Sequence, residues 1–364
     1  FATAQSVVNA GVQAYTAALA KISNYANQAS GAVTPQLSDF EEAGITGLVD
    51  GDITMINALL IQREAAEDGI ATTPFGIQSV VNAGLAAIFK IRDAAENNTA
   101  VSGSLTVDDY TAVGIDANDI VDADALNSAL DSQPVNGVIA RSFTSLSEVV
   151  TAVKNLLINA DEGSAGADGV PLTADDLIAM GVSGFVATTG EPTKQTAAVA
   201  IFNDLIDTKA DADVDTVAKT QALYDAVGAV LRTATGDTPM VTKVQLGLLG
   251  FDVDNADSIV ITDVTDNNLS AIQQVLTNLN LDTDFTNLTS LAQLQTLTNN
   301  AISALNALEA AAQGDDASAI TATTAFSDMG VTTVTSGDKT ARTEKKLEAL
   351  KTEIANENNT RKKT

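Results

Sequence analysis

The side chains most able to do chemistry in this 364-residue chain are carboxylates, because it contains no His and no Cys. Zinc sites of the Cys/His type, disulfides and imidazole or thiol catalysis are therefore excluded. GxSxG elbows, Walker A loops and dinucleotide-binding glycine patterns do not occur either. The acidic pairs Asp108–Asp109 and Asp175–Asp176 stand where helices are predicted to begin, and there a carboxylate complements the helix dipole. The sequence predicts that the protein is not an enzyme.

Two acidic loops carry candidate metal ligands. The loop 161–170 holds Asp161 and Asp168 around three glycines, and the stretch 251–258 holds Asp252 and Asp254. Alternating oxygen ligands in tight turns suit Ca²⁺. Neither loop has the EF-hand spacing or its final Glu, so an acidic linker between repeats is the alternative interpretation. Calcium is the one cofactor that these patterns suggest.

The charge balance restricts the partners. Acidic residues number 47 against 19 basic ones, for a net charge of −28. Contacts with nucleic-acid phosphates and with anionic lipid both need Lys and Arg, so we expect no nucleic-acid binding. No apolar run reaches the roughly 18 residues of a membrane helix, and we expect no membrane insertion. No signal peptide starts the chain, and it begins at Phe1 rather than at an initiator Met, so we expect a processed form or a piece of something longer.

One phrase recurs five times and defines the organisation of the chain. A polar start and a short apolar turn lead to a Gly followed by an apolar residue. The copies are LSDFEEAGI at 37–45, LTVDDYTAVGI at 105–115, LTADDLIAMGV at 172–182, VTKVQLGLLGF at 241–251 and ITATTAFSDMGV at 320–331. Their glycines are Gly44, Gly114, Gly181, Gly250 and Gly330, spaced by 70, 67, 69 and 80 residues. Such a period predicts an array of copied units, which typically scaffolds, spaces or binds.

Each unit is predicted to contain three helices. The phrase forms the first, with N-caps at Ser38, Thr106 and Thr173 and acidic capping-box partners at Glu41, Asp109 and Asp176. The Gly ends that helix in a left-handed conformation, and the following apolar residue packs back on it. Second helices are predicted at 52–60, 122–130 and 266–276. Third helices have apolar stripes of period 3.6 over 77–91, 146–157 and 294–308, while 195–231 fits two further helices.

These patterns predict an all-α tandem array of small three-helix bundles. Apolar residues make up 45% of the chain but aromatic ones only 4%, so each repeat should have a small hydrophobic core that is stabilised by packing against adjacent repeats. The predicted boundaries are a lone third helix at 1–31, repeats at 32–100, 101–168, 169–237 and 238–316, and a two-helix partial repeat at 317–364.

The two ends have complementary patterns. The heptapeptide QSVVNAG at 5–11 is repeated letter for letter at 78–84, inside a third helix, while the last segment has two predicted helices. Eight of the 19 basic residues lie from Lys339 onward. Either the chain is part of a longer array, or its ends join head to tail between subunits. The apolar assembly candidates are Val7, Val8 and Tyr15 at one end and Phe326, Leu347, Leu350 and Ile354 at the other.

The repeat resembles a known class of bacterial protein. The resemblance is based on Tyr110, Gly114 and Ile115 in the second repeat, with Leu177, Gly181 and Val182 in the third. The three-helix unit is similar to repeats of large bacterial surface adhesins and biofilm proteins and, more distantly, to GA-type albumin-binding modules. The long acidic loops depart from the albumin-binding pattern.

The resemblance implies an extracellular or cell-surface protein with a structural or adhesive role. We expect a stalk or self-assembling filament, with self-association as the main interaction. The alternative is a module that binds a host protein or a matrix polysaccharide.

Overall fold

The computed structural model describes residues 2–67, 69–101, 105–132, 135, 143–160, 170–183, 192–251, 264–266, 268–279, 285 and 288–312, with backbone alone at 2, 192–193 and 307–312. Every regular element in these ranges is an α-helix or a short 3₁₀ helix, which confirms the all-α prediction. The chain divides into two compact units. Unit 1 comprises Phe1–Ser183 and Lys209–Lys219, and unit 2 comprises Gly184–Thr208 and Thr220–Thr364.

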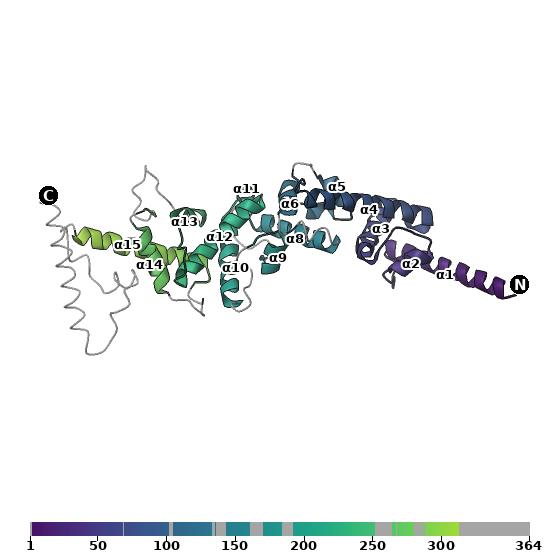
Figure 1. The fold of residues 1–364 in the computed structure, drawn as a ribbon, viewed down its shortest axis with the longest axis horizontal. Helices are drawn as coiled ribbons and strands as arrows, with labels where there is room; N and C mark the ends of the chain where they lie inside the picture. The colour runs from purple at the N-terminus through teal and green to yellow at the C-terminus, as the bar shows by residue number, and fades with distance from the viewer. Residues whose placement is uncertain are drawn as a thin grey trace, which may run out of the picture. The chain divides into compact units, whose positions relative to one another are not determined.

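Unit 1 is a succession of short and long helices (Figure 1). Its elements are α1 (Ala2–Ala26), α2 (Leu37–Glu42), η1 (Asp50–Asp52), α3 (Ile53–Ala66), η2 (Ile70–Thr72), α4 (Pro74–Glu96), α5 (Val107–Thr111), η3 (Ala117–Asp119), α6 (Ala123–Leu130), α8 (Phe143–Asn159), α9 (Ala174–Ala179) and α11 (Asp211–Val214).

The long helix α4 shows how the sequence forms these elements. Thr73 is its N-cap and accepts a hydrogen bond from the Gly76 N–H at 3.1 Å, and Pro74 occupies the first turn, where a missing N–H costs nothing. The predicted stripe is buried as expected, at Ile77, Val80, Val81, Gly84, Ile88 and Ile91. Because α3 packs along this stripe, its own apolar residues Met55, Ile56, Leu59 and Leu60 complete the core.

The next long helix, α8, repeats this arrangement. Its predicted stripe is buried at Leu146, Val149, Val150, Val153, Leu156 and Leu157. Helices α6 and α9 both pack against α8. Aliphatic side chains of about the same size thus fill equivalent positions in consecutive parts of unit 1, and this confirms the 3.6-residue periodicity seen in the sequence.

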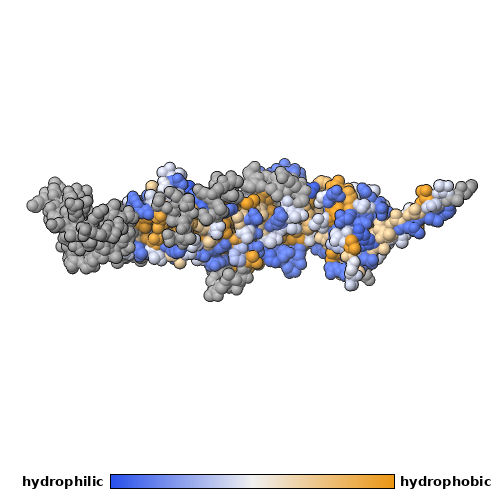
Figure 2. Space-filling model, turned by 90° about the horizontal axis from the view of Figure 1, so that it is seen from below, coloured by the Kyte–Doolittle hydropathy of each residue, from blue (hydrophilic) through white to orange (hydrophobic). Residues whose placement is uncertain are grey.

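Helix α1 is packed along only part of its length. Its C-terminal half buries Ala18, Ile22 and Ala26, and it contacts α2 and α3. The first turns carry Val7, Val8 and Val12 with 69%, 58% and 59% of their surface exposed. In Figure 2 the start of α1 extends past the rest of unit 1 with apolar and polar atoms both in solvent.

Unit 2 also consists of short and long helices. Its elements are α10 (Pro192–Ile206), α12 (Val217–Ala234, whose first three residues belong to unit 1), α13 (Lys243–Leu248), α14 (Leu269–Asn278) and α15 (Leu291–Ala312). Phe202 of α10 and Tyr224 of α12 meet edge to face with ring centroids 5.4 Å apart, a favourable aromatic geometry. Helix α14 packs against α15. The two helices predicted within 195–231 are α10 and α12, and the short α11 between them was not predicted.

Candidate functional site

The first helices of the four described phrase copies end in the same hydrogen-bonded turn. Glycines 44, 114, 181 and 250 have φ values of 76°, 94°, 89° and 88°, a conformation that costs Gly little. At α2 the Gly44 N–H donates to the Glu41 carbonyl and the Ile45 N–H to the Phe40 carbonyl. This pair of bonds is a Schellman motif, and α5, α9 and α13 end with the same pair. The fifth glycine, Gly330, lies outside the described residues.

Burial explains why the apolar residue follows the Gly. The N–H of the residue after the Gly donates to a carbonyl whose own side chain is fully buried in each copy: Phe40, Tyr110, Leu177 and Leu246. The residue after the Gly is 9% exposed or less, as Ile45, Ile115, Val182 and Phe251. Each turn therefore closes a helix and anchors it to the core with two apolar side chains.

The helix starts differ in one respect from the prediction. At α9 the Thr173 N–H donates to the Asp176 carboxylate at 2.8 Å and the Asp176 N–H donates to the Thr173 hydroxyl at 3.2 Å, a complete capping box. The Thr106 N–H donates likewise to Asp109 at 2.9 Å. The first copy was predicted wrongly: Gln36, not Ser38, is the N-cap of α2, and its N–H donates to Asp39, not Glu41.

The fourth copy also has a complete capping box that the prediction missed. The Thr242 N–H donates to the Gln245 side chain at 2.9 Å, and the Gln245 N–H donates to the Thr242 hydroxyl at 3.2 Å. The Thr-x-x-Gln spacing is a capping-box signal in the sequence, so this feature could have been found there.

A buried amide joins the second helix to the first in consecutive copies. The Asn57 side chain of α3 donates to the Pro35 carbonyl at 3.0 Å, and the Asn127 side chain of α6 donates to the Leu105 carbonyl at 3.0 Å. Both pairs are separated by 22 residues, and both carbonyls immediately precede an N-cap. Burying an amide costs free energy unless it is hydrogen-bonded, so each bond fixes one geometry for the two helices. Sequence reasoning missed these residues, although their recurrence at the repeat period marks them.

A charged pair joins each of the first two long helices to the short helix that follows. Lys21 of α1 lies 2.6 Å from Asp39 of α2, and Lys90 of α4 lies 2.5 Å from Asp109 of α5. Burial alone raises the pKa of Asp109, but the Lys90 ammonium and the Thr106 N–H outweigh it and hold this pKa below its ordinary value. The carboxylates thus cap a helix and bind a neighbouring helix at once.

The cap glycines differ in what surrounds them. A Cβ added at Gly114 would lie 3.4 Å from the side chains of Ala58 and Leu59 on α3. A Cβ added at Gly181 would collide with Ser132 and Val135, which follow α6. At Gly44 and Gly250 nothing lies within 4 Å. The Gly114 cap therefore packs against α3 and the Gly181 cap against the residues after α6, while two caps are open among the described residues.

The remaining predicted sites fall into two groups. The N-terminal assembly candidates Val7 and Val8 are exposed, and Tyr15 is 39% exposed. The calcium candidates Asp161, Asp168, Asp252 and Asp254 lie outside the described residues, as do Phe326, Leu347, Leu350 and Ile354. Within the described ranges, no group of three or more acidic residues is placed to hold a metal ion.

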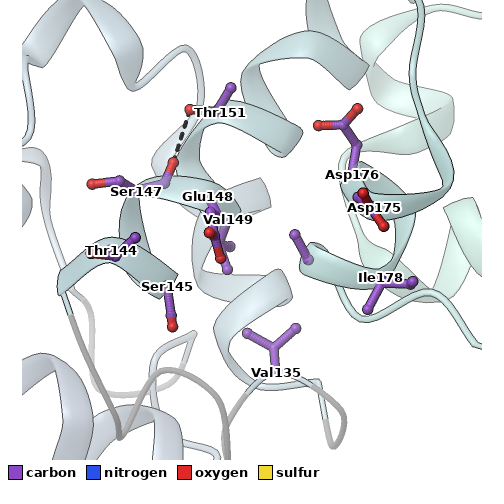
Figure 3. A pocket seen from close by; sticks show the side chains of 11 residues that line it. Val135, Thr144, Ser145, Ser147, Glu148, Val149, Thr151, Asp175, Asp176 and Ile178 are labelled. Atoms are coloured by element: carbon purple, nitrogen blue, oxygen red, sulfur yellow. Dashed lines mark hydrogen bonds between the residues drawn. The ribbon is translucent and has the colours of Figure 1, made fainter.

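One groove of about 550 Å³ lies between α8 and α9 (Figure 3). It is lined by Val135, Thr144, Ser145, Ser147, Glu148, Val149, Thr151, Asp175, Asp176, Ile178 and Ala179. The carboxylate of Asp176 is already bonded to Thr173 as a cap, and the lining offers hydroxyls and acids but no base or nucleophile activated by a neighbour.

Helix α4 meets the length and composition expected of a membrane-spanning helix, the one such case among the described residues. In unit 1 its apolar stripe is buried against α3. Core helices of folded domains commonly share this property, so the absence of membrane insertion stays a prediction.

Comparison of the chain with known proteins found no similar protein. No family model matches the chain, and no curated protein and no solved structure matches it either.

Proposed function

We propose that the protein is a non-enzymatic structural repeat protein, a tandem array of three-helix bundles that acts as a stalk or spacer. One observation carries the proposal: the same buried amide bond recurs in consecutive copies, from Asn57 to Pro35 and from Asn127 to Leu105. An enzyme concentrates different polar groups in one pocket, whereas here two buried asparagines, 70 residues apart in the sequence, form the same bond between a second and a first helix. Repetition of one joint is typical of proteins that hold a distance.

The bundles of the proposed array share helices with their neighbours. In unit 1, α3 packs against α1, α4 and α8, which are the long helices of three consecutive predicted repeats. In unit 2, α10 contacts α15, the long helix of the following predicted repeat. A second helix that touches three long helices couples each repeat to the next, and such coupling lets an array resist being pulled apart.

The proposed location is the surface of a bacterial cell, in an adhesin or biofilm component. This part of the proposal depends on the resemblance of the phrase around Tyr110, Gly114 and Ile115. Phe40, Tyr110 and Phe143 are buried, which supports a structural role, whereas Phe75 and Phe89 are 86% and 60% exposed.

A single-molecule stretching experiment on the full chain tests the proposal. An array of repeats near 70 residues should unfold in several steps that each release about 240 Å of contour length, from roughly 3.4 Å per extended residue. A single cooperative domain would release the whole contour at once. One step spanning the whole chain would contradict the array and with it the proposed spacer role.

A ligand-binding module is the second candidate, because the groove between α8 and α9 exposes Ile178 (44%) beside hydroxyl and carboxylate groups. A host protein or polysaccharide that binds there should lose affinity on Ile178→Asp. The matched control is Val244→Asp, which adds the same charge at an apolar residue 72% exposed on α13. Equal binding by both variants would exclude the groove.

A further inference from the structure

The second helices of the four predicted repeats, α3, α6, α10 and α14, share one register. Each contains an amide residue with buried apolar residues one position before it and two and three positions after it. The amides are Asn57, Asn127, Asn203 and Gln273, and the buried neighbours are Ile56, Leu59 and Leu60; Leu126, Ala129 and Leu130; Phe202, Leu205 and Ile206; and Ile272, Val275 and Leu276. This register identifies corresponding residues in helices of different length.

The amide binds the first helix of its own repeat. Besides the bonds made by Asn57 and Asn127, the Gln273 side chain donates to the Val241 carbonyl at 2.7 Å. Val241 immediately precedes the N-cap of α13, as the other two carbonyls precede theirs. Glutamine therefore makes the same connection from the same register position.

The residue after the amide binds a different helix. The Val217 N–H donates to the Ser128 hydroxyl at 3.1 Å, and the Leu291 N–H donates to the Asp204 carboxylate at 3.0 Å. Val217 and Leu291 are the first residues of α12 and α15, the long helices of the next predicted repeats. Both partners of the first bond belong to unit 1, and both partners of the second belong to unit 2. Successive residues of a helix point roughly 100° apart, so one second helix can bind its own repeat and the next one.

These bonds complete the capping of the two long helices. The Lys219 N–H donates to the Thr216 hydroxyl at 3.4 Å, and the Gln293 N–H donates to the Ser290 hydroxyl at 3.2 Å. Both local bonds satisfy the third N–H of a helix. The first N–H has no acceptor within its own helix, and the preceding repeat supplies one.

The residue in this position varies from repeat to repeat although its neighbours keep their register. It is Ala58 in α3, Ser128 in α6, Asp204 in α10 and Gln274 in α14. Ala58 has no side-chain acceptor, and it lies beside the Gly114 cap instead. The position therefore combines a fixed place in the fold with a changeable chemistry.

We propose that the residue after the amide sets how strongly consecutive repeats are coupled, by capping the long helix of the next repeat. The inference deepens the proposed spacer function and rests on it. The Asp204 carboxylate complements the positive end of the α15 dipole, whereas the Ser128 hydroxyl makes a neutral bond, so the α10–α15 joint is the stronger one. Asp204 is exposed and Ser128 is half-buried, so substitutions there change the joint and leave the apolar core intact.

Hydrogen–deuterium exchange of the full chain, read by mass spectrometry, tests the proposal at α15. Asp204→Ala should speed exchange in residues 291–298 about fivefold and leave α4 unchanged, because loss of a capping acceptor frays the start of a helix. Asp204→Ser keeps an acceptor and should restore most of the protection. The matched control Asp207→Ala removes the same charge at an exposed residue of the same segment that has no hydrogen bond to the described part of α15. It should exchange like the parent.

The α12 joint allows the reverse substitution. Ser128→Ala should speed exchange in residues 217–224 about fivefold, whereas Ser128→Asp should slow it below the rate of the parent, since a carboxylate adds its attraction to the helix dipole. High salt should remove part of the gain from Ser128→Asp. Unchanged exchange of α12 and α15 in the two alanine variants would overturn the proposal. Equal effects of Asp204→Ala and Asp207→Ala would also overturn it, because charge alone would then explain the protection.

The stretching experiment separates this inference from the proposed function. If the chain unfolds in repeated steps but α12 and α15 do not respond to these substitutions, the capping between repeats is wrong and the spacer role stands. If both helices respond as predicted but the chain unfolds in one step, the capping stands and the repeat array is wrong.

Discussion

The first and second junctions of unit 1 are built from the same parts and differ in one covering helix. Each has a long helix with the QSVVNAG heptapeptide, a lysine–aspartate pair and a short helix that ends in a Schellman motif. The α4–α5 junction has α3 packed over it, while among the described residues no such helix covers the start of α1 or the Gly44 cap.

This difference separates local structure from tertiary packing. The glycine φ values, 76° at Gly44 and 94° at Gly114, are alike although one cap is covered and the other is open. The turn is therefore formed by its own hydrogen bonds, and the covering helix adds burial. The same substitution at matched positions should cost different amounts of free energy. Three such pairs, and one substitution in the covering helix α3, test the comparison.

The largest expected difference is at the cap glycines. Valine at either cap must adopt a left-handed conformation, at a cost of about 1–2 kcal/mol. Gly114→Val also places methyl groups against Ala58 and Leu59, so it should lower the free energy of unfolding by about 3 kcal/mol in total. Gly44→Val should cost only the free energy of the left-handed backbone, because its Cβ meets nothing within 4 Å. Urea unfolding followed by circular dichroism measures both. Equal losses at the two caps would show that α3 does not press on Gly114.

The buried and exposed valines of the heptapeptide give the next difference. Val81→Ala removes two buried methyl groups and should cost about 2 kcal/mol, since Val81 is 0% exposed. Val8→Ala, at 58% exposure, should change the free energy of unfolding by less than about 0.5 kcal/mol in dilute solution. A large loss for Val8→Ala in the monomer would mean that the start of α1 is packed within the chain.

The third experiment concerns Glu64 of α3, because this carboxylate connects the covering helix to Asn27, the residue directly after α1. It is 6% exposed and accepts hydrogen bonds from the Ala71 N–H at 2.7 Å, the Gly69 N–H at 2.9 Å and the Asn27 side chain at 3.2 Å. Burial raises the pKa of Glu64, but these donors outweigh it and the pKa lies below its ordinary value.

A depressed carboxylate pKa adds stability at neutral pH that is lost as the pH falls through the folded-state pKa. We therefore expect Glu64→Gln to cost about 1–3 kcal/mol at pH 7 and less once acid has protonated the parent. Urea midpoints measured from neutral to acid pH give the two values. The exposed control Glu67→Gln should be close to neutral throughout, and a cost for Glu64→Gln that does not depend on pH would contradict the carboxylate role.

The smallest expected effects have opposite signs. Gly11→Ala should stabilise the monomer by about 0.5–1 kcal/mol, because Ala is the better helix former and its Cβ meets nothing within 4 Å. Gly84→Ala should destabilise by about 1 kcal/mol, because its Cβ would meet Leu59 at 2.5 Å in a packed core. Thermal melts of the two variants give the comparison, and a gain in both would show that the α3–α4 contact is loose.

The sequence by itself determined the helices and their ends. Periods of 3.6 residues placed α4 and α8, and a glycine followed by an apolar residue located the turns after α2, α5, α9 and α13, because both signals act over one or two helical turns. The cap of α2 was misplaced because Gln36 is not among the usual N-cap residues, so the sequence favoured Ser38.

The tertiary structure decided which identical residues become core. Nothing in QSVVNAG distinguishes its copy in α1 from its copy in α4, yet one is exposed and the other is buried. The long-range bonds were likewise hidden from a local pattern. The carbonyls that bind Asn57 and Asn127 lie 22 residues from them in the chain, and the lysines that pair with Asp39 and Asp109 lie 18 and 19 residues from these carboxylates. Burial depends on which helix arrives from elsewhere in the chain, and a local pattern carries no information about that neighbour.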